Sequence, residues 1–434
     1  MNDSLPSSPI RRLLPMLVAL GIDAFALTIV PADALSRPLL AAAALLALIW
    51  VGVQPRGDDR DDLLPALAVL IAGIGLTEVT RLSAALGRRQ EIGMVVSLAL
   101  LVLLRPVLEQ YRRWARVKYL WVLLSIALFA LVEIAGTEVN GAKLWLRFAG
   151  VSFQPVELIK LFLVFFLAAY LAESGEVIAQ AAPWRLRANL RYLGPLFLGW
   201  GIAMAILVLQ HDVGMAVLFL GVFLTMLYAG TRRLDLAVGS LAVFAVAAVV
   251  AARHFAYLRV RLDVWLHPFA DPLGSGYQAL MGLFSLAAGG LFGTGLRLGH
   301  PTIPDVATDY IYAAWSEEAG LIGAAILLAI YLVLVSRALG VALRRPDLYS
   351  KMLVLGLASM LGLQIFVIVG GVVGLLPLTG ITLPFVSYGG SSLIANFLLV
   401  DIVWIASGLG NASRVTAGSV REGAARGRSE ARAQ

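Results

Sequence analysis

The chain has 434 residues, 60% of them hydrophobic and only 14% charged, with a net charge of +7 and no cysteine. Soluble domains carry about 25% charged residues, so this composition excludes an ordinary soluble globular protein. The lack of cysteine excludes disulfide bonds and thiolate metal sites. The basic residues gather in the connections between apolar runs, which is a pattern of membrane topology and argues against nucleic-acid binding.

Apolar runs of about 20 residues, the length that crosses the hydrocarbon core of a bilayer, recur along the chain. The runs are continuous and lack the alternation of barrel strands, which predicts an all-α polytopic integral membrane protein. Twelve transmembrane helices are predicted, at residues 13–31, 39–53, 63–80, 92–108, 119–135, 153–173, 193–210, 213–230, 234–252, 310–336, 352–373 and 389–408. Lysine and arginine concentrate in alternate connections, above all in RPVLEQYRRWARVK at 105–118, so both termini are predicted to be cytoplasmic.

This topology leaves one large extracytoplasmic loop, at about 253–308. Its segment 277–295 is apolar and rich in glycine, which predicts short interfacial or re-entrant helices. Residues 411–434 are rich in arginine, glycine and alanine and are predicted to form a basic, disordered cytoplasmic tail that contacts membrane lipids.

The connection NGAKLWLRFAGVSFQPVELIK (140–160) is the first cluster of ionisable residues at a membrane edge. Lys143 and Arg147 are four residues apart, so both would meet one phosphate if this segment is helical. Glu157 and Lys160 are three residues apart and are candidates for an ion pair inside the helix bundle. The alternative is that the cluster only anchors the topology and holds a structural ion pair.

Two further outside segments carry candidate residues. In LQHDVG (209–214), Asp212 either binds substrate or simply caps the following helix. Farther on, Arg259 and Arg261 precede the turn-rich stretch DPLGSGYQ, which ends in Tyr277 and Gln278. For most of that stretch a loop role alone is the simpler interpretation.

The stretch PDVATDYIYAAWSEEAG (304–320) holds four acids, Asp305, Asp309, Glu317 and Glu318. The structural alternative for Asp309 is a position in the first turn of the next helix, after an N-cap at Thr308. On a continuous helix Asp309 and Glu317 would be about 12 Å apart, too far for a pair of catalytic carboxylates. A single carboxylate that acts as a base is therefore favoured, while Glu317 and Glu318 are predicted to pair within the bundle.

The last cluster is LLPLTGITLPFVSYGGSSLIAN (375–396), whose prolines and Gly389–Ser392 run are incompatible with a plain helix. Irregular backbone at this depth must line a cavity or be buried in protein. Free N–H groups of this turn could hold an anion at the start of the last span. Tight helix packing is the alternative.

Several of these motifs, in this order, resemble those of the shape, elongation, division and sporulation (SEDS) family of bacterial cell-wall polymerases, which includes FtsW, RodA and SpoVE. They are PDVATDYIYAAWSEEAGLIGA, DPLGSGYQ and LPFVSYGGSSLIAN. The resemblance covers about residues 63–410 and implies a ten-span core, preceded by an extension, residues 1–62, with two extra transmembrane helices. It leans slightly toward the elongation members, RodA-like, over the division and sporulation members.

The resemblance implies a glycosyltransferase that joins lipid II units into peptidoglycan strands on the outer face of the bacterial cytoplasmic membrane and releases undecaprenyl diphosphate. The linkage is inverted, so one step with one general base is expected, and Asp309 in TDYIYA matches the family's essential carboxylate. The departing diphosphate calls for positive charge, from basic residues or from a divalent cation such as Mg or Mn, and no other cofactor is indicated. A class B penicillin-binding protein, a transpeptidase, is the implied partner.

The candidates for binding the substrate or its diphosphate are Lys143, Arg147, Asp212, Arg259, Arg261, Tyr277, Gln278, Arg297, Asp305, Ser387, Tyr388, Gly389, Gly390, Ser391 and Ser392. The chain departs from the family motifs at Leu144, where arginine is usual, at Val156, where serine is usual, and at His211, where proline is usual. These changes leave open which basic residue binds the diphosphate.

Two other functions compete with the polymerase. A flippase or transporter of lipid-linked precursors would carry ionisable groups near the bilayer midplane and an internal repeat, whereas most candidate acids here are predicted at the outer edge and no repeat is evident. A non-catalytic scaffold of the wall-synthesis complex would be expected to have lost Asp309, which is present.

Overall fold

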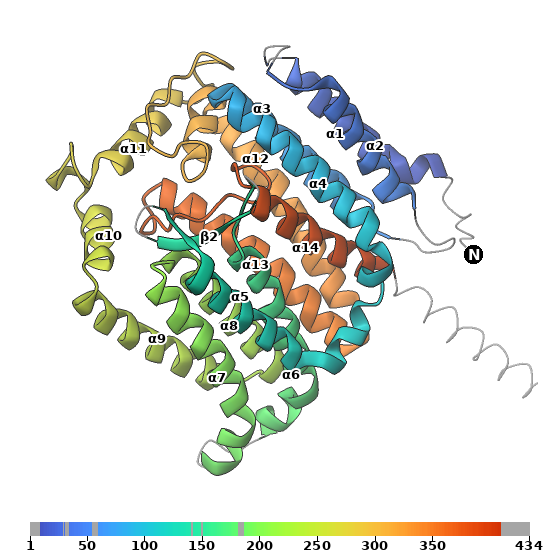
Figure 1. Ribbon diagram of the computed structural model, residues 1–434, viewed down its shortest axis with the longest axis vertical. Coiled ribbons are helices and arrows are strands. Elements are labelled where there is room, and N and C mark those ends of the chain that lie inside the picture. The colour runs from blue at the N-terminus through green and yellow to red at the C-terminus, as the bar shows by residue number, and fades with distance from the viewer. Residues whose placement is uncertain are drawn as a thin grey trace, which may run out of the picture.

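The computed structural model describes residues 9–28, 30, 34–53, 60–139, 142–148, 151–180 and 186–408, and most of them are helical (Figure 1). The long helices are α1 (Pro9–Leu27), α2 (Arg37–Gly52), α3 (Leu63–Leu82), α4 (Ala84–Leu108), α5 (Lys118–Ala135), α6 (Val156–Gln180), α7 (Leu186–Leu209), α8 (Val213–Thr231), α9 (Leu234–His254), α12 (Ile311–Arg344), α13 (Leu348–Val372) and α14 (Gly390–Gly408). The short elements are η1 (Tyr111–Val117), α10 (Ala256–Leu266), η2 (Pro268–Ala270), α11 (Tyr277–Gly289), β1 (Thr137–Val139), β2 (Ala142–Phe148) and β3 (Val151–Phe153).

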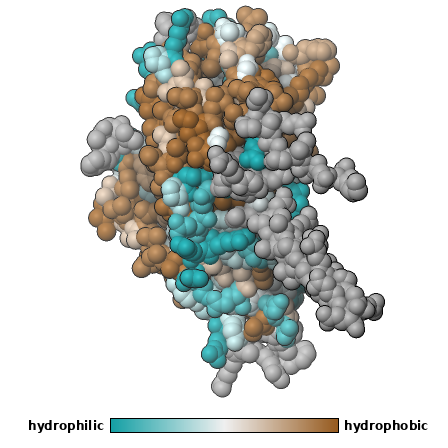
Figure 2. All heavy atoms as spheres, turned by 90° about the vertical axis from the view of Figure 1, so that its right-hand side faces the viewer, coloured by the Kyte–Doolittle hydropathy of each residue, from teal (hydrophilic) through white to brown (hydrophobic). Residues whose placement is uncertain are grey.

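The helices agree with the predicted membrane fold. Each predicted span overlaps one of the long helices. Within the described ranges, nine helical segments are long and apolar enough to cross a membrane: α3, α4, η1 with α5, α7, α8, α9, α12, α13 and α14. Figure 2 shows hydrophobic side chains over the upper part of one face and hydrophilic ones gathered below them. The all-α polytopic fold is therefore confirmed, while the count of twelve spans stays a prediction.

The interior is built around α13, which packs against α6, α8 and α12. Most residues of α13 are buried, as expected of a helix without a polar face. At the edge of the molecule α9 is equally apolar but almost wholly exposed, with Val243 at 71%. Helix α9 is therefore a peripheral helix of the described structure.

The first two helices pack onto the rest of the chain, along one side of the molecule (Figure 1). Helix α1 lies on α3, where Gly73 leaves room for the carboxyl group of Asp23. Helix α2 reaches α14 through a 2.8 Å hydrogen bond from the Trp50 indole N–H to Asp401. The predicted extension 1–62 thus shares a packed interior with the predicted core, and the boundary between them stays a prediction. The predicted tail 411–434 lies outside the described residues.

The connection after α5 is formed by strands and not by the helix considered for Lys143 and Arg147. Residues 137–153 form a small antiparallel sheet in the order β1-β2-β3, so the helical arrangement considered for Lys143 and Arg147 is wrong. Four residues in a strand span about 13 Å, so the spacing by itself no longer brings the two side chains together. The alternation of charged or aromatic side chains with Leu144 and Leu146 is the strand signal in this segment.

Helix α12 is broken at Gly320, which has φ +67° and ψ −175°. The short helix α11 confirms that 277–295 contains a short helix, while its interfacial or re-entrant position stays a prediction. The loop after α11 supplies partners for the backbone groups freed at the break. Thr294 N–H donates to the Glu317 carbonyl at 2.9 Å, and Leu321 N–H donates to the Gly290 carbonyl at 3.0 Å. Backbone groups freed inside a membrane need such partners, so the loop after α11 and the broken helix form one unit.

Candidate active site

Asp309 lies in the loop directly before α12. Its N–H and that of Thr308 donate to the Asp305 carbonyl at 3.0 and 3.1 Å, which makes 305–309 a tight turn with Asp305 at φ +53°. The helix begins at Ile311, and Tyr310 is its N-cap residue. The expectation of a cap at Thr308, with Asp309 in the first helical turn, is therefore wrong. Asp309 precedes the helix, and its carboxylate has no capping role there.

The turn before α14 holds this segment in place. The Ser387 hydroxyl donates to the Thr308 carbonyl, and Tyr388 N–H donates to the Ala307 carbonyl at 2.8 Å. Gly389 N–H donates to the Gln90 side chain of α4 at 3.2 Å, and the Gln90 amide donates back to the Ser387 carbonyl. The N–H groups of Tyr388 and Gly389 are therefore already bonded within the protein, while an anion held by the N–H groups of Gly390, Ser391 and Ser392 stays a prediction.

The serines that follow are also used within the protein. Ser391 Oγ accepts from Gln154 N–H at 2.9 Å, and Ser392 Oγ lies 2.7 Å from Thr382 Oγ1. Gly390 begins α14. The turn 387–392 thus clamps the segment that carries Asp309, which is closer to the packing alternative than to a binding loop.

A cavity of about 230 Å³ opens beside Asp309. Its walls come from α10, α11, the end of α13 and the loop after it. Of the predicted site residues it brings together Arg261, Gln278 and Asp309, the last next to Gly380, where an added Cβ would lie 3.6 Å from Asp309 Oδ2. Gln278 also donates to the Pro304 carbonyl at 2.9 Å, which fixes the loop that leads to Asp309.

The surroundings of the Asp309 carboxyl raise its pKa. Burial raises its pKa to about 6, and the nearby charge of Asp305 also raises it. The Thr308 hydroxyl and the charge of Arg261 act in the opposite direction. A carboxylate with a pKa just below neutrality is ionised at physiological pH yet basic enough to accept a proton from a reacting hydroxyl.

Asp212 is the N-cap of α8. Its Oδ1 accepts from Met215 N–H at 3.0 Å, so the capping interpretation is confirmed. Burial raises its pKa to about 6, and it feels the charges of Glu157 and Arg261. Asp212 therefore belongs to the electrostatic surroundings of the cavity, although it does not line it.

The other predicted basic residues lie elsewhere. Lys143 and Arg147 are exposed on β2, where the Lys143 ammonium contacts the Glu133 carbonyl at 3.4 Å. Arg259 is exposed on α10, and Arg297 lines a different cavity. Tyr277 begins α11 and Asp305 is exposed, and neither lines the cavity beside Asp309.

Comparison with known proteins identifies the family. The model of the FtsW, RodA and SpoVE cell cycle proteins matches residues 64–408. The chain belongs to this family. It is 38% identical to the peptidoglycan glycosyltransferase RodA of Mycobacterium tuberculosis over 381 residues, which cover 84% of this chain and 81% of that relative. It is 34% identical to the stage V sporulation protein E of Bacillus subtilis over 299 residues, 68% of this chain and 78% of that one.

Solved structures agree. A chain from a peptidoglycan synthase complex that coordinates polymerization and crosslinking matches with a TM-score of 0.65 and 31% identity, over 80% of this chain and 97% of that one. The rod shape determining protein RodA of Thermus thermophilus matches with a TM-score of 0.58 and 29% identity, over 81% and 97%. The higher identity to RodA than to the sporulation relative supports the predicted lean toward RodA.

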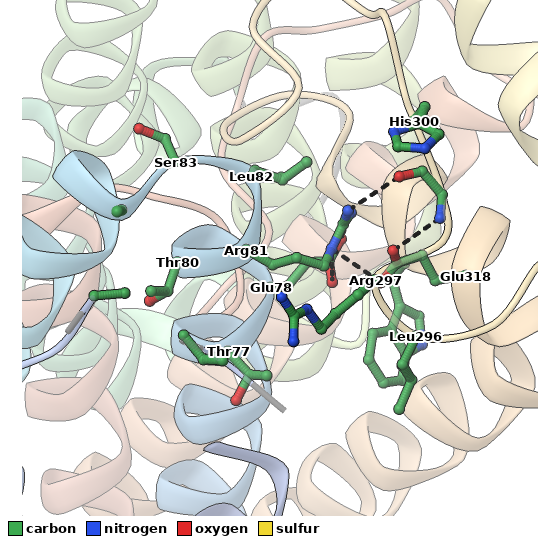
Figure 3. A pocket seen from close by; sticks show the side chains of 15 residues that line it. Thr77, Glu78, Thr80, Arg81, Leu82, Ser83, Leu296, Arg297, His300 and Glu318 are labelled. Atoms are coloured by element: carbon green, nitrogen blue, oxygen red, sulfur yellow. Dashed lines mark hydrogen bonds and ion pairs between the residues drawn. The ribbon is translucent and has the colours of Figure 1, made fainter. Parts of the chain in front are cut away.

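This FtsW/RodA/SpoVE chain has a second and larger cavity, of about 370 Å³, beside the C-terminal end of α3 and the first turns of α12 (Figure 3). Arg81 forms ion pairs with Glu78 at 2.7 Å and with Glu318 at 2.9 Å. Glu317 accepts from Ser285 and from His300 N–H. The predicted pairing of Glu318 within the bundle is confirmed, and Glu317 is held by neutral donors instead.

Glu78 and Arg81 are charged residues that line this cavity, and the sequence analysis did not predict them as site residues. Glu78 lies within the predicted span 63–80, and a charged residue there is the signal that could have found it. Arg81 is already paired with Glu78 and Glu318, whereas no ion pair of Arg261 in the smaller cavity is found among the described residues, so the cavity beside Asp309 is the candidate for the chemistry.

The predicted pair of Glu157 and Lys160 is confirmed, with 2.6 Å between Oε2 and Nζ and both side chains buried. Lys160 also donates to Gln364 of α13 at 3.0 Å and to Asn396 of α14 at 3.4 Å. A buried ion with several partners in different helices joins α6, α13 and α14 of the FtsW/RodA/SpoVE core.

Proposed function

We propose that this protein is a peptidoglycan glycosyltransferase that joins lipid II units into glycan strands and releases undecaprenyl diphosphate, in the manner of RodA in cell elongation. The observation that carries the proposal is a partly buried carboxylate, Asp309, with a pKa raised to about 6 beside a cavity that also holds an arginine. The proposal is also supported by the 38% identity of this chain to a protein named peptidoglycan glycosyltransferase RodA.

The reaction needs one base. The hydroxyl oxygen of one lipid-linked sugar bonds to the anomeric carbon of another, and its proton passes to Asp309. The bond from the anomeric carbon to the diphosphate breaks, and its electron pair stays on the diphosphate oxygen. Asp309 is the only acid among the residues that line the described cavity, which fits a one-step inverting displacement and not a pair of carboxylates.

The cavity suits only part of the substrate. Its volume of about 230 Å³ is below the roughly 300–1,000 Å³ typical of pockets that enclose a drug-sized ligand. It would hold the diphosphate and the reacting end of a sugar, while the lipid and the remaining saccharide extend outside it.

The topology is proposed from the same site. With twelve spans and both termini in the cytoplasm, Asp309, the β1–β3 sheet and the loop at about 253–308 lie on the outer face of the cytoplasmic membrane. The basic segment 105–118, which contains η1, lies on the cytoplasmic side, in agreement with the distribution of positive charge.

A divalent cation and a protein partner are part of the proposal. The described residues include no group of three or more side chains that could hold a metal ion. Mg or Mn would therefore be held largely by the diphosphate itself and would supply charge for the leaving group. The partner is a class B penicillin-binding protein, supported by the likeness to a chain of a synthase complex that couples polymerization to crosslinking.

The test is polymerisation of purified lipid II by the full-length protein together with its partner. Asp309→Asn is expected to lower the rate at least about 100-fold, the contribution of a general base. Asp263→Asn, which changes an exposed acid on α10, is the matched control and should retain the parent rate. Equal rates for Asp309→Asn and the parent, with both folded, would remove Asp309 as the base. Translocation of lipid II in vesicles without polymer would favour a flippase, and neither activity would favour a scaffold.

A further inference from the structure

Helix α10 is attached to the rest of the molecule by one line of polar side chains. Tyr257, Arg261 and Trp265 are spaced four residues apart and therefore share one face of the helix. Tyr257 Oη donates to the Val208 carbonyl at 2.9 Å, and Trp265 Nε1 donates to the Gly374 carbonyl at 3.0 Å. No residue of α10 is fully buried, and these hydrogen bonds, together with the packing of the Tyr257 ring on His211, help to position the helix, which lies at the edge of the molecule (Figure 1).

Arg261, in the middle of this line, keeps most of its donors unused. Its Nη1 contacts the carbonyls of Leu378 and Thr379 at 3.5 and 3.2 Å. A guanidinium has five N–H groups, and Nε and Nη2 make no hydrogen bond within the described part of the chain. Because Arg261 lines the cavity beside Asp309, these donors are available to a ligand there.

The carbonyl contacts tie Arg261 to the loop that contains Gly380, the residue next to Asp309. The loop that Arg261 contacts is packed closely: an added Cβ on Gly214 would lie 2.6 Å from the Thr379 carbonyl, and Gly380 is next to Asp309. Asp309 and Asp212 both feel the charge of Arg261. Arg261 thus lines the same cavity as Asp309 and lies close enough to Asp309 and Asp212 for its charge to act on both.

We propose that Arg261 binds the diphosphate of the lipid-linked donor and stabilises it as it leaves. This inference rests on the proposed function and selects one cation from the five outside candidates. As the bond to the anomeric carbon breaks, negative charge collects on the diphosphate oxygen, where a planar guanidinium donates two parallel hydrogen bonds. Among the described basic residues, Arg261 alone lines the cavity that holds Asp309.

Arg261 also acts on the base. The titratable groups that face Asp309 are Asp305 and Tyr310 beside it in the chain and Arg261 of α10, and through Arg261 also Asp212 before α8. The charge of Arg261 lowers the pKa of Asp309, so removing that charge raises it. Asp309 must be ionised to accept a proton, so the polymerisation rate falls at low pH. In the pH–rate profile this fall, the acid limb, then moves to higher pH.

The first experiment compares Arg261→Gln, Arg261→Lys and Arg259→Gln in lipid II polymerisation. Arg259, exposed on the same helix, is the matched control and should leave the rate unchanged. For Arg261→Gln the loss of charged hydrogen bonds predicts kcat/KM lowered about 10- to 100-fold, with the acid limb moved to higher pH. Arg261→Lys should restore the position of the acid limb but not the full rate, because an ammonium lacks the bidentate geometry.

The second experiment measures binding without catalysis. Undecaprenyl diphosphate and undecaprenyl phosphate are titrated against the folded full-length protein. The parent should prefer the diphosphate, and Arg261→Gln should lose about tenfold in affinity for the diphosphate with little change for the monophosphate. Unchanged affinity and an unmoved acid limb in a folded Arg261→Gln protein would overturn the inference. An inactive parent protein that still binds the diphosphate through Arg261 would instead refute the proposed function alone.

Discussion

At the scale of single residues, the site depends on how burial and charge set one carboxylate apart from its neighbours. Asp305 is exposed, whereas Asp309, four residues later, is partly buried and has a pKa raised to about 6. The sequence predicted Asp309 from spacing and resemblance. It could not predict that Arg261, and not Lys143 or Arg297, shares its cavity, because the walls come from segments between residues 260 and 380 that meet only in the fold.

The raised pKa of Asp309 predicts the pH dependence of polymerisation. The base works when ionised, so the rate should rise as pH increases through about 6 and level off above it. Initial rates measured on both sides of this pH, with tryptophan fluorescence to check folding, provide the test. Asp212 also has a pKa raised to about 6, so Asp212→Asn is the informative comparison. A limb that disappears in Asp212→Asn would assign the titration to that residue and not to Asp309.

At the scale of elements, hydropathy predicted where the helices are but not where they are interrupted. Glycine is common in membrane helices, so Gly320 carries no sign in the sequence that α12 breaks there. The break becomes necessary because the loop after α11 lies against it: an added Cβ on Gly320 would be 2.3 Å from Gly293 N. The β1–β3 sheet was missed for a related reason, since the spacing of Lys143 and Arg147 is compatible with a helix and with a strand.

Gly320→Ala is predicted to destabilise the protein by at least about 1–3 kcal/mol, because only glycine readily adopts this backbone conformation and the added methyl group meets the α11 loop. Gly340→Ala in the same helix is the matched control, as its Cβ would meet no atom closer than 3.7 Å. Thermal unfolding of both variants in detergent tests this. Equal unfolding temperatures would mean that the junction between α11 and α12 is not rigid.

At the scale of the whole molecule, the two N-terminal helices are part of the packed structure and not an appended anchor. Resemblance predicted them as an addition to a ten-span core, and their hydropathy gave no sign of what they contact. In the structure Trp50 of α2 reaches the core, with its ring edge-on to Phe397 at 5.9 Å and to Trp404 at 5.8 Å. Its indole N–H donates to the buried Asp401, which also pairs with Arg105 of α4 at 3.4 Å.

Trp50→Phe is therefore expected to lower stability by about 1–3 kcal/mol, because a buried carboxylate loses a donor while most of the aromatic packing is kept. Leu45→Ala, at a 59% exposed position on the same helix, is the control and should have little effect. The measurement is the thermal unfolding midpoint, read together with the polymerisation rate at a temperature where both variants are folded. Asp401 lies in α14, which begins at the turn that clamps the Asp309 loop. A loss of stability with an unchanged rate would show that α2 supports the fold alone, whereas a fall in both would connect the N-terminal helices to the site through α14.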